Sequence, residues 1–106
     1  MSKRNYRTLD QVEENILRDN PEDIDAYVQD IFASYAEHKN ASALLASLRV
    51  VAKVKGMSDL ANEIGMTREG LYKALSAKGN PRFDNINALM RSFGYQLMPQ
   101  KIDGPA

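Results

Sequence analysis

The chain has 106 residues, 43% of them hydrophobic, and its 14 Lys and Arg balance 14 Asp and Glu, which suits one domain of zero formal charge. It contains no cysteine, which excludes disulfides and thiolate metal sites and favours a reducing compartment. No apolar run approaches the roughly 20 residues that cross a bilayer, and the first residues lack the apolar segment of a signal peptide, so we expect a cytoplasmic protein.

The charge is divided unevenly along the chain. Residues 1–40 hold 5 Lys and Arg against 9 Asp and Glu, a net of −4, whereas residues 41–106 hold 9 against 5, a net of +4. The two parts are therefore expected to face different partners. Uneven scatter of charge in a short chain is the alternative explanation.

Residues 1–20 mix charges with sparse apolar positions. Leu9, Val12 and Ile16 follow a helical spacing, but no strong capping residue precedes them. We expect this segment to be an extended N-terminal arm.

A helix is predicted over residues 21–37. Its start is well specified, because Asn20 suits the N-cap, Pro21 suits the first turn, and two acidic residues follow at the positive end of the helix dipole. Apolar residues then recur at helical spacing, which predicts one buried stripe. The stripe consists of Ile24, Tyr27, Val28, Ile31, Phe32 and Tyr35.

A second helix is predicted from Asn40 or Ser42, either of which suits the N-cap, to Lys55. Gly56 suits the left-handed position that commonly follows a helix. The buried stripe of this helix consists of Leu44, Leu45, Leu48, Val51 and Ala52, and its basic residues, assigned to the solvated surface, are Arg49, Lys53 and Lys55.

Two short helices are predicted over residues 58–65 and 67–76. Their buried residues are Leu60, Ala61 and Ile64 in the first and Leu71, Ala74 and Leu75 in the second. Ala61 permits a close crossing, Gly65 turns the chain without a Cβ penalty, and Met66 fills the corner. Together these features predict a helix-turn-helix.

A fifth helix is predicted over about residues 83–93, after the loop "AKGNPRF". Its apolar side consists of Ile86, Leu89, Met90 and Phe93, and Gly94 ends it. "YQLMP", residues 95–99, is the one strand candidate, and the final "KIDGPA" is expected to fray. The chain is thus predicted to be all-α.

The outward face of the 67–76 helix is polar and carries an aromatic residue. A helix of ten residues is about 15 Å long, and the major groove of B-DNA, about 12 Å wide, admits one. Arg68 suits guanine O6 and N7, and Glu69 suits cytosine N4. The residues suited to phosphates or a thymine methyl are Thr67, Tyr72 and Lys73.

Gly70 is unusual inside a helix, because glycine costs about 1 kcal/mol relative to alanine there. We expect it to permit close approach of a DNA backbone or a neighbouring helix. Simple tolerance of glycine at this position is the alternative.

The segment "GMSDLANEIGMTREGLYKALSAKGNPRFDNINALMRSFGYQL" resembles the helix-turn-helix antidote proteins of bacterial addiction modules, within the wider Xre and phage-repressor superfamily. The resemblance runs over about residues 41–98, and "GMTREGLYKALSAKGNP" is its most specific part; "DIDAYV" also resembles the family's opening. It implies a five-helix lambda-repressor-like domain. It also implies an antitoxin that binds a RelE/ParE-like toxin and represses its own operon as a homodimer.

Two residues depart from the family's pattern. Asp59 stands where members commonly carry a Gln that contacts phosphate or base, and a carboxylate there would repel the DNA backbone. Arg82 stands where members commonly carry a Ser or Thr N-cap, so this chain lacks that cap but gains a candidate phosphate contact.

On this reading residues 1–20 are the arm, residues 21–98 the helical DNA-binding domain, and residues 99–106 a flexible tail. The candidate DNA-contacting residues are Ser58, Thr67, Arg68, Glu69, Tyr72, Lys73, Ser76, Lys78 and Arg82. Two such helices about 34 Å apart in a dimer would select an inverted-repeat operator in double-stranded DNA. The fifth helix and pairing of the "YQLMP" strands are the expected dimer contacts.

Three other functions were weighed against the DNA-binding antitoxin. Catalysis is rejected, because His38 has no evident partner, neighbouring acids such as Glu13 and Glu14 point apart, and no residue set resembles a metal or cofactor site. A stand-alone Xre-type regulator remains open, as does a protein-interaction module that does not bind DNA. The acidic residues Asp25, Asp30 and Glu37, together with the arm, favour a basic protein partner.

Overall fold

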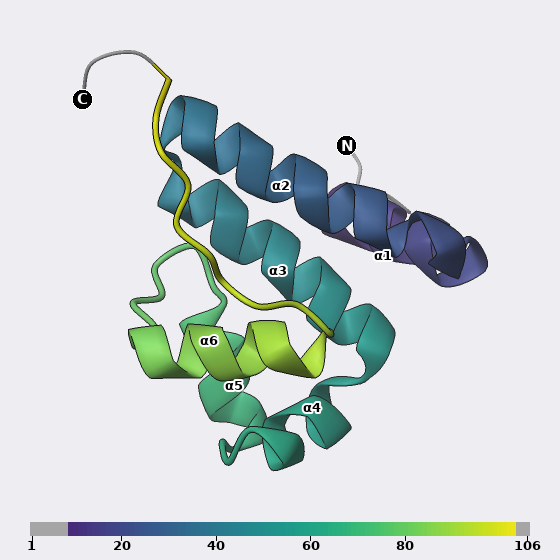
Figure 1. Ribbon diagram of the computed structural model, residues 1–106. Helices are drawn as coiled ribbons and strands as arrows, with labels where there is room; N and C mark the ends of the chain where they lie inside the picture. Colours follow the sequence, from purple (N-terminus) through teal and green to yellow (C-terminus); the bar gives the residue numbers. More distant parts are fainter. Residues whose placement is uncertain (1–8, 104–106) are drawn as a thin grey trace, which may run out of the picture.

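The computed structural model describes residues 9–103. Over this range the chain forms six α-helices and one short 3-10 helix, and no strand. The elements are α1 (Leu9–Asp19), η1 (Pro21–Asp23), α2 (Ile24–His38), α3 (Ala41–Lys55), α4 (Met57–Glu63), α5 (Arg68–Ala74) and α6 (Phe83–Ser92) (Figure 1). The all-α prediction is confirmed for the described residues, with one α-helix more than the five expected. None of these helices is long and apolar enough to cross a membrane.

Helix α3 is the centre of the fold. Helices α1 and α2 pack along it, α4 follows its C-terminal end, and α5 and α6 lie with α4 on one side of it (Figure 1). Leu48, Val51 and Ala52 of α3 are almost completely buried, as the apolar stripe predicted. They share one core with Leu71 and Leu89 from the shorter helices. Because each such large side chain contributes roughly 1.5–3 kcal/mol on burial, this core fixes how the shorter helices are placed.

The expected N-terminal arm is wrong for residues 9–19, which form helix α1 packed on α3. Leu17 is only 4% exposed, and Arg18 forms an ion pair with Glu14 one turn earlier. The Arg18 guanidinium also donates to the carbonyl of Lys53 on α3. An isolated helix of this length is marginal in water, so these tertiary contacts stabilise it. The part of the arm before residue 9 lies outside the described residues.

The junction between α1 and α2 differs from the predicted capped start. Asn20 makes no capping hydrogen bond to the next helix; its side-chain amide donates to the carbonyl of Ile16 and closes α1 instead. Pro21 opens the 3-10 turn, and α2 begins only at Ile24. The polar residue before the proline therefore ends one helix rather than starting the next.

Helix α3 begins as one of the two predicted alternatives requires. The Asn40 side chain accepts a hydrogen bond from the backbone N–H of Ala43, at 3.0 Å, and is the N-cap. Ser42 has a different use, since its hydroxyl donates to the carbonyl of Ala77 in the loop that follows α5. The sequence therefore also ties the start of α3 to the end of the short helices.

The predicted strand at residues 95–99 is not present. The backbone N–H of Tyr95 donates to Met90 at the end of α6, and the following residues pass over α3 without regular secondary structure (Figure 1). Tyr95 and Leu97 pack against the core, and the Tyr95 hydroxyl donates to Asp25 on α2. Inward and outward side chains do alternate at residues 95–98, but the described part of the chain offers no strand with which this segment could pair.

Candidate nucleic-acid interface

Residues 64–67 join α4 to α5 in a tight corner. Gly65 has a φ of +77°, in the left-handed region that favours glycine, and the N–H of Met66 donates to the carbonyl of Ala61 at 2.8 Å. Ala61 is buried where the helices meet, and Met66 packs against the core. The corner therefore holds α5 at a fixed angle to α4.

Thr67 begins α5 as its N-cap. The Thr67 hydroxyl oxygen accepts a hydrogen bond from the N–H of Gly70, at 2.9 Å. A Cβ on Gly70 would lie 2.8 Å from this oxygen, which is closer than side-chain carbons approach. The structure thus explains the glycine locally, because the missing Cβ of Gly70 leaves room for the Thr67 hydroxyl that caps the same helix.

Helix α5 has one buried and one exposed side. Leu71, and Leu75 just after the helix, are at most 2% exposed and anchor it in the core. The exposed residues on its opposite side are Thr67, Arg68, Glu69 and Lys73. Four of the candidate DNA-contacting residues therefore share one solvent-facing surface.

Tyr72 is half-buried between two cations rather than fully exposed. The Arg68 guanidinium carbon lies 5.4 Å from the centre of the Tyr72 ring, and the Lys53 ammonium nitrogen lies 5.6 Å from it. Attraction between cations and the ring face favours this arrangement. Lys53 comes from α3 and was assigned to the solvated surface, so the structure adds it to the candidate site.

The remaining basic candidates gather around the C-terminal end of α5. Lys73, Lys78 and Arg82 line an open depression of about 460 Å³, and no carboxylate lines it. The uncharged polar residues in its lining are Ser76, Asn80 and Asn85. The Ser76 hydroxyl donates to the carbonyl of Lys73, at 2.8 Å, so it also finishes the helix. This surface is a concentrated positive patch in a chain of zero formal charge.

Two further contacts shape the depression. A Cβ on Gly79 would lie 2.2 Å from the carbonyl oxygen of Ala74, so only glycine lets the loop pass this close to the end of α5. Arg82 forms an exposed ion pair with Asp84, with Nε 3.2 Å from Oδ1, and it provides no side-chain cap for α6. An exposed pair of this kind is worth roughly 0–1 kcal/mol, so the guanidinium is readily released to another anion.

Helix α4 carries the opposite charge. Asp59 and Glu63 are exposed on it, and residues 56–67 contain no Lys or Arg. Ser58, the remaining candidate, is exposed in its first turn beside Asp59. The Asp59 carboxylate lies near the positive end of the α4 dipole, which favours an acid at this position. The cations of this surface therefore come from α5, α3 and the loop before α6, and not from α4.

Arg49 connects this surface to the N-terminal helix. Its guanidinium donates to the carbonyl of Leu75, at 2.8 Å, and forms an ion pair with Asp10 on α1. The side chain is half-buried and was wrongly assigned to the solvated surface. Arg49 makes these contacts only in the folded chain, because Asp10 and Leu75 are far from it in the sequence.

His38 is exposed, 3.8 Å from the exposed carboxylate of Glu37. Over the described range no group of three His, Cys, Asp or Glu side chains is arranged to hold a metal ion.

Comparison with known proteins identifies the family. The model of a family described as probable addiction module antidote protein matches residues 8–101. An uncharacterized protein of Haemophilus influenzae is 35% identical over 80 residues, which make up 76% of this chain and 78% of the relative. No solved structure matches the chain with significance. Because the family match extends over all six helices, the chain belongs to the probable addiction module antidote family.

Proposed function

We propose that this protein is an antitoxin that neutralises a RelE/ParE-like toxin and represses its own operon by binding double-stranded DNA as a dimer. The family supports the antidote role. One observation carries the DNA-binding role: five cations lie on α5 or in the two depressions that flank it. These cations are Lys53, Arg68, Lys73, Lys78 and Arg82.

In this proposal α5 is the recognition helix of a helix-turn-helix. Its seven residues extend about 10 Å, which is short enough to enter the major groove. Arg68 and Glu69, in its first turn, read guanine and cytosine edges, and the Thr67 hydroxyl donates its proton to a phosphate. The Tyr72 ring keeps the Arg68 side chain against the helix, so Arg68 loses less side-chain entropy on binding.

The depression next to α5 is the proposed phosphate contact. Lys73 and Lys78 supply point charges, and Arg82 exchanges Asp84 for a phosphate oxygen. Asp59 and Glu63 on α4 would repel a backbone, so the DNA lies toward α5 and the start of α6. This placement accounts for an Asp at position 59 in a DNA-binding chain.

Binding of wild-type protein to its operator tests the proposal. With about three phosphates neutralised per subunit, the logarithm of the DNA association constant of a dimer should fall with the logarithm of the salt concentration with a slope near −5. The probe is the DNA immediately upstream of the gene, with scrambled DNA of equal length for comparison, and affinity is measured by fluorescence anisotropy.

Three variants make this experiment specific. We expect Arg68→Ala to lose roughly 1–3 kcal/mol and to discriminate less between operator and scrambled DNA, because a base contact is lost. Lys73→Ala should weaken binding to operator and scrambled DNA alike, and it should make the salt slope shallower by about one per subunit. Lys101→Ala, an exposed lysine near the chain end, is the control and should bind as wild type does. A slope near zero, or equal losses in all three variants, would contradict groove binding.

A further inference from the structure

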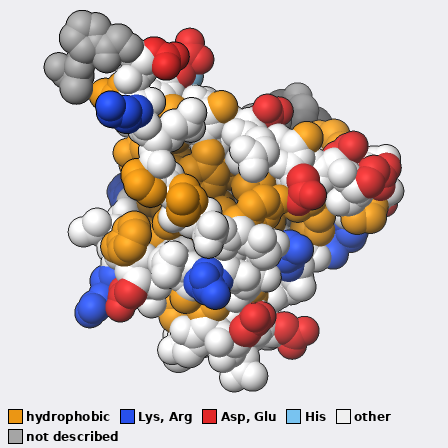
Figure 2. Space-filling view, viewed as in Figure 1, with side chains coloured by type: hydrophobic (Ala, Val, Ile, Leu, Met, Phe, Trp, Pro, Cys, Tyr) orange, Lys and Arg blue, Asp and Glu red, His pale blue; other side chains and the backbone are white. Residues whose placement is uncertain are grey.

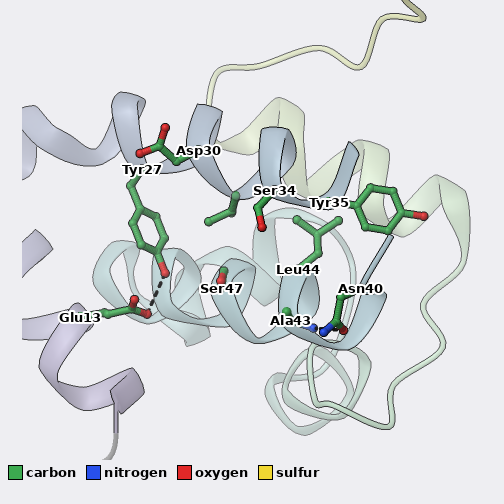
Figure 3. Close-up of a pocket in the computed structure, with 10 residues that line it drawn as sticks. Glu13, Tyr27, Asp30, Ser34, Tyr35, Asn40, Ala43, Leu44 and Ser47 are labelled. Atoms are coloured by element: carbon green, nitrogen blue, oxygen red, sulfur yellow. Dashed lines mark hydrogen bonds between the residues drawn. The ribbon is translucent and has the colours of Figure 1, made fainter. Parts of the chain in front are cut away.

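A groove lies between α2 and α3 and is bordered at one end by α1 (Figure 3). Its volume is about 370 Å³, enough for one or two side chains of a partner. The lining residues used below are Glu13, Tyr27, Asp30, Ile31, Tyr35 and Leu44. The candidate DNA-contacting residues are absent from its lining, so the groove is a separate surface.

The floor and walls of the groove suit an aliphatic chain. Ile31 and Leu44 are partly buried, packing against the core with one side and facing the groove with the other. Tyr35 is 37% exposed at one end, and the half-buried Tyr27 stands near the other (Figure 3). Burial of this apolar surface by a partner would be favourable, by about 25 cal/mol for each Å² removed from water.

Among the described residues, the charges that line the groove are all negative. Glu13 and Asp30 are its carboxylates, and no Lys or Arg is among its lining residues. The Tyr27 hydroxyl donates to Glu13 at 3.0 Å, which fixes that carboxylate in place (Figure 3). Asp30 is exposed and has neither an ion pair nor a hydrogen-bonded side-chain partner within the described range. One carboxylate is thus held by a hydrogen bond, and the other has no such contact among the described residues.

The surroundings extend the same negative field. Residues 19–38 contain six Asp and Glu and no Lys or Arg. Carboxylates gather at the end of the molecule where α2 begins (Figure 2). A field of one sign attracts a partner of the other and repels nucleic acid, so this surface and the cationic surface at α5 select different molecules.

We propose that this groove is the toxin-docking site and that it receives a Lys or Arg side chain from a helix or strand of the toxin. The aliphatic stem packs on Ile31 and Leu44 between the tyrosine rings, and the cationic head pairs with Asp30 in the negative field to which Glu13 contributes. The inference rests on the proposed antitoxin function. It adds the location of the toxin surface and the chemistry of the side chain that enters it.

The experiment uses the full chain and, as the probe, the purified product of the open reading frame adjacent to its gene. Affinity is measured by titration calorimetry at low and at physiological salt. Asp30→Lys reverses the exposed negative charge, and Ser34→Trp fills the groove from an exposed position on α2. Asp59→Lys, an equal charge change on α4, is the control. Far-ultraviolet circular dichroism checks that all variants keep their helices.

We expect Asp30→Lys and Ser34→Trp each to weaken toxin binding at least tenfold, and Asp59→Lys to change it less than twofold. Salt should weaken the wild type more than Asp30→Lys. If the wild type binds the probe and both groove variants bind within twofold of it, the groove inference is overturned while the antitoxin function stands. If the wild type does not bind the probe at all, the proposed function fails and the inference with it. If the groove variants only change self-association, a second copy of this chain occupies the groove and the inference is also overturned.

Discussion

Two tyrosine hydroxyls form hydrogen bonds that join distant parts of the chain. Tyr27 of α2 donates to Glu13 of α1, and Tyr95, after α6, donates to Asp25 of α2. Burial, reinforced by the neighbouring carboxylate, raises the pKa of Tyr27 to about 12. Burial and the bond to Asp25 raise the pKa of Tyr95 to about 12 as well. Both hydroxyls therefore stay protonated well above the ordinary tyrosine value of 10.0.

These raised pKa values predict an alkaline limit to stability. The folded state holds the two protons more tightly than the unfolded state does, so the stability they contribute is complete below about pH 10 and is lost as the pH rises toward 12. Tyrosinate absorbance should show a late component that Tyr27→Phe reduces. A late component of unchanged size in Tyr27→Phe would show that burial of this hydroxyl does not control its titration.

At the scale of elements, α1 is an integral part of the helical unit. Besides Leu17 in the core, it supplies Asp10 to Arg49, and Arg49 in turn holds the carbonyl of Leu75 after α5. Gln11 and Glu14 of α1 also line a second depression, which they share with Arg68 and Tyr72. Helix α1, which borders the proposed toxin groove, is therefore joined through Arg49 to the end of α5, which carries the proposed DNA contacts.

Replacement of Arg49 measures this connection. Arg49→Met keeps the aliphatic stem but removes one charge-assisted bond to a carbonyl and one ion pair, both half-buried. We expect a loss of about 1–3 kcal/mol in the free energy of unfolding from urea titrations, because hydrogen bonds to charged groups are worth roughly 1.5–3 kcal/mol. Arg91→Met, at an exposed position on α6, should change it by less than about 0.5 kcal/mol. Equal values for the two variants would argue against an organising role for Arg49.

At the scale of the whole molecule, the dimer proposal needs an apolar surface that a single chain leaves exposed. Apolar side chains gather over the middle of the face that α2, α3 and the C-terminal segment share (Figure 2). Met98 and Ile102 of that segment are 71% and 76% exposed. Among residues 96–103 no backbone–backbone hydrogen bond is formed with the rest of the described chain. A segment with free backbone groups and exposed apolar side chains is suited to pair with a second copy.

Charge at these positions tests the dimer without disturbing the core. Truncation after Phe93 would also remove Tyr95 and Leu97, which pack against the core, so substitution is the cleaner change. We expect Met98→Glu combined with Ile102→Glu to sediment as a monomer at concentrations where the wild type is a dimer, because carboxylates would be buried against each other. Gln100→Glu is the control and should remain dimeric. A dimeric double variant would place the interface elsewhere, and α6 with its exposed Phe83 would then be the next surface to change.

The sequence by itself determined the five helices from residue 24 to residue 92, because each has an apolar stripe at helical spacing. Local capping chemistry at Asn40 and Thr67 set the start of two of them. The sequence also determined which residues of α5 face solvent, since burial of Leu71 and Leu75 leaves only one outward side. The operator contacts and the lambda-repressor-like architecture stay predictions.

Only the tertiary structure decided the rest, and the reason is the same in each case. Helix α1, the position of Lys53 beside Tyr72, and the use of Arg49 depend on groups brought close by folding. The residues near each of these side chains in the sequence do not show which group it will contact, because that group lies on another helix. The C-terminal segment failed as a strand for the converse reason: its alternation is real, but a strand exists only where another strand supplies the hydrogen bonds.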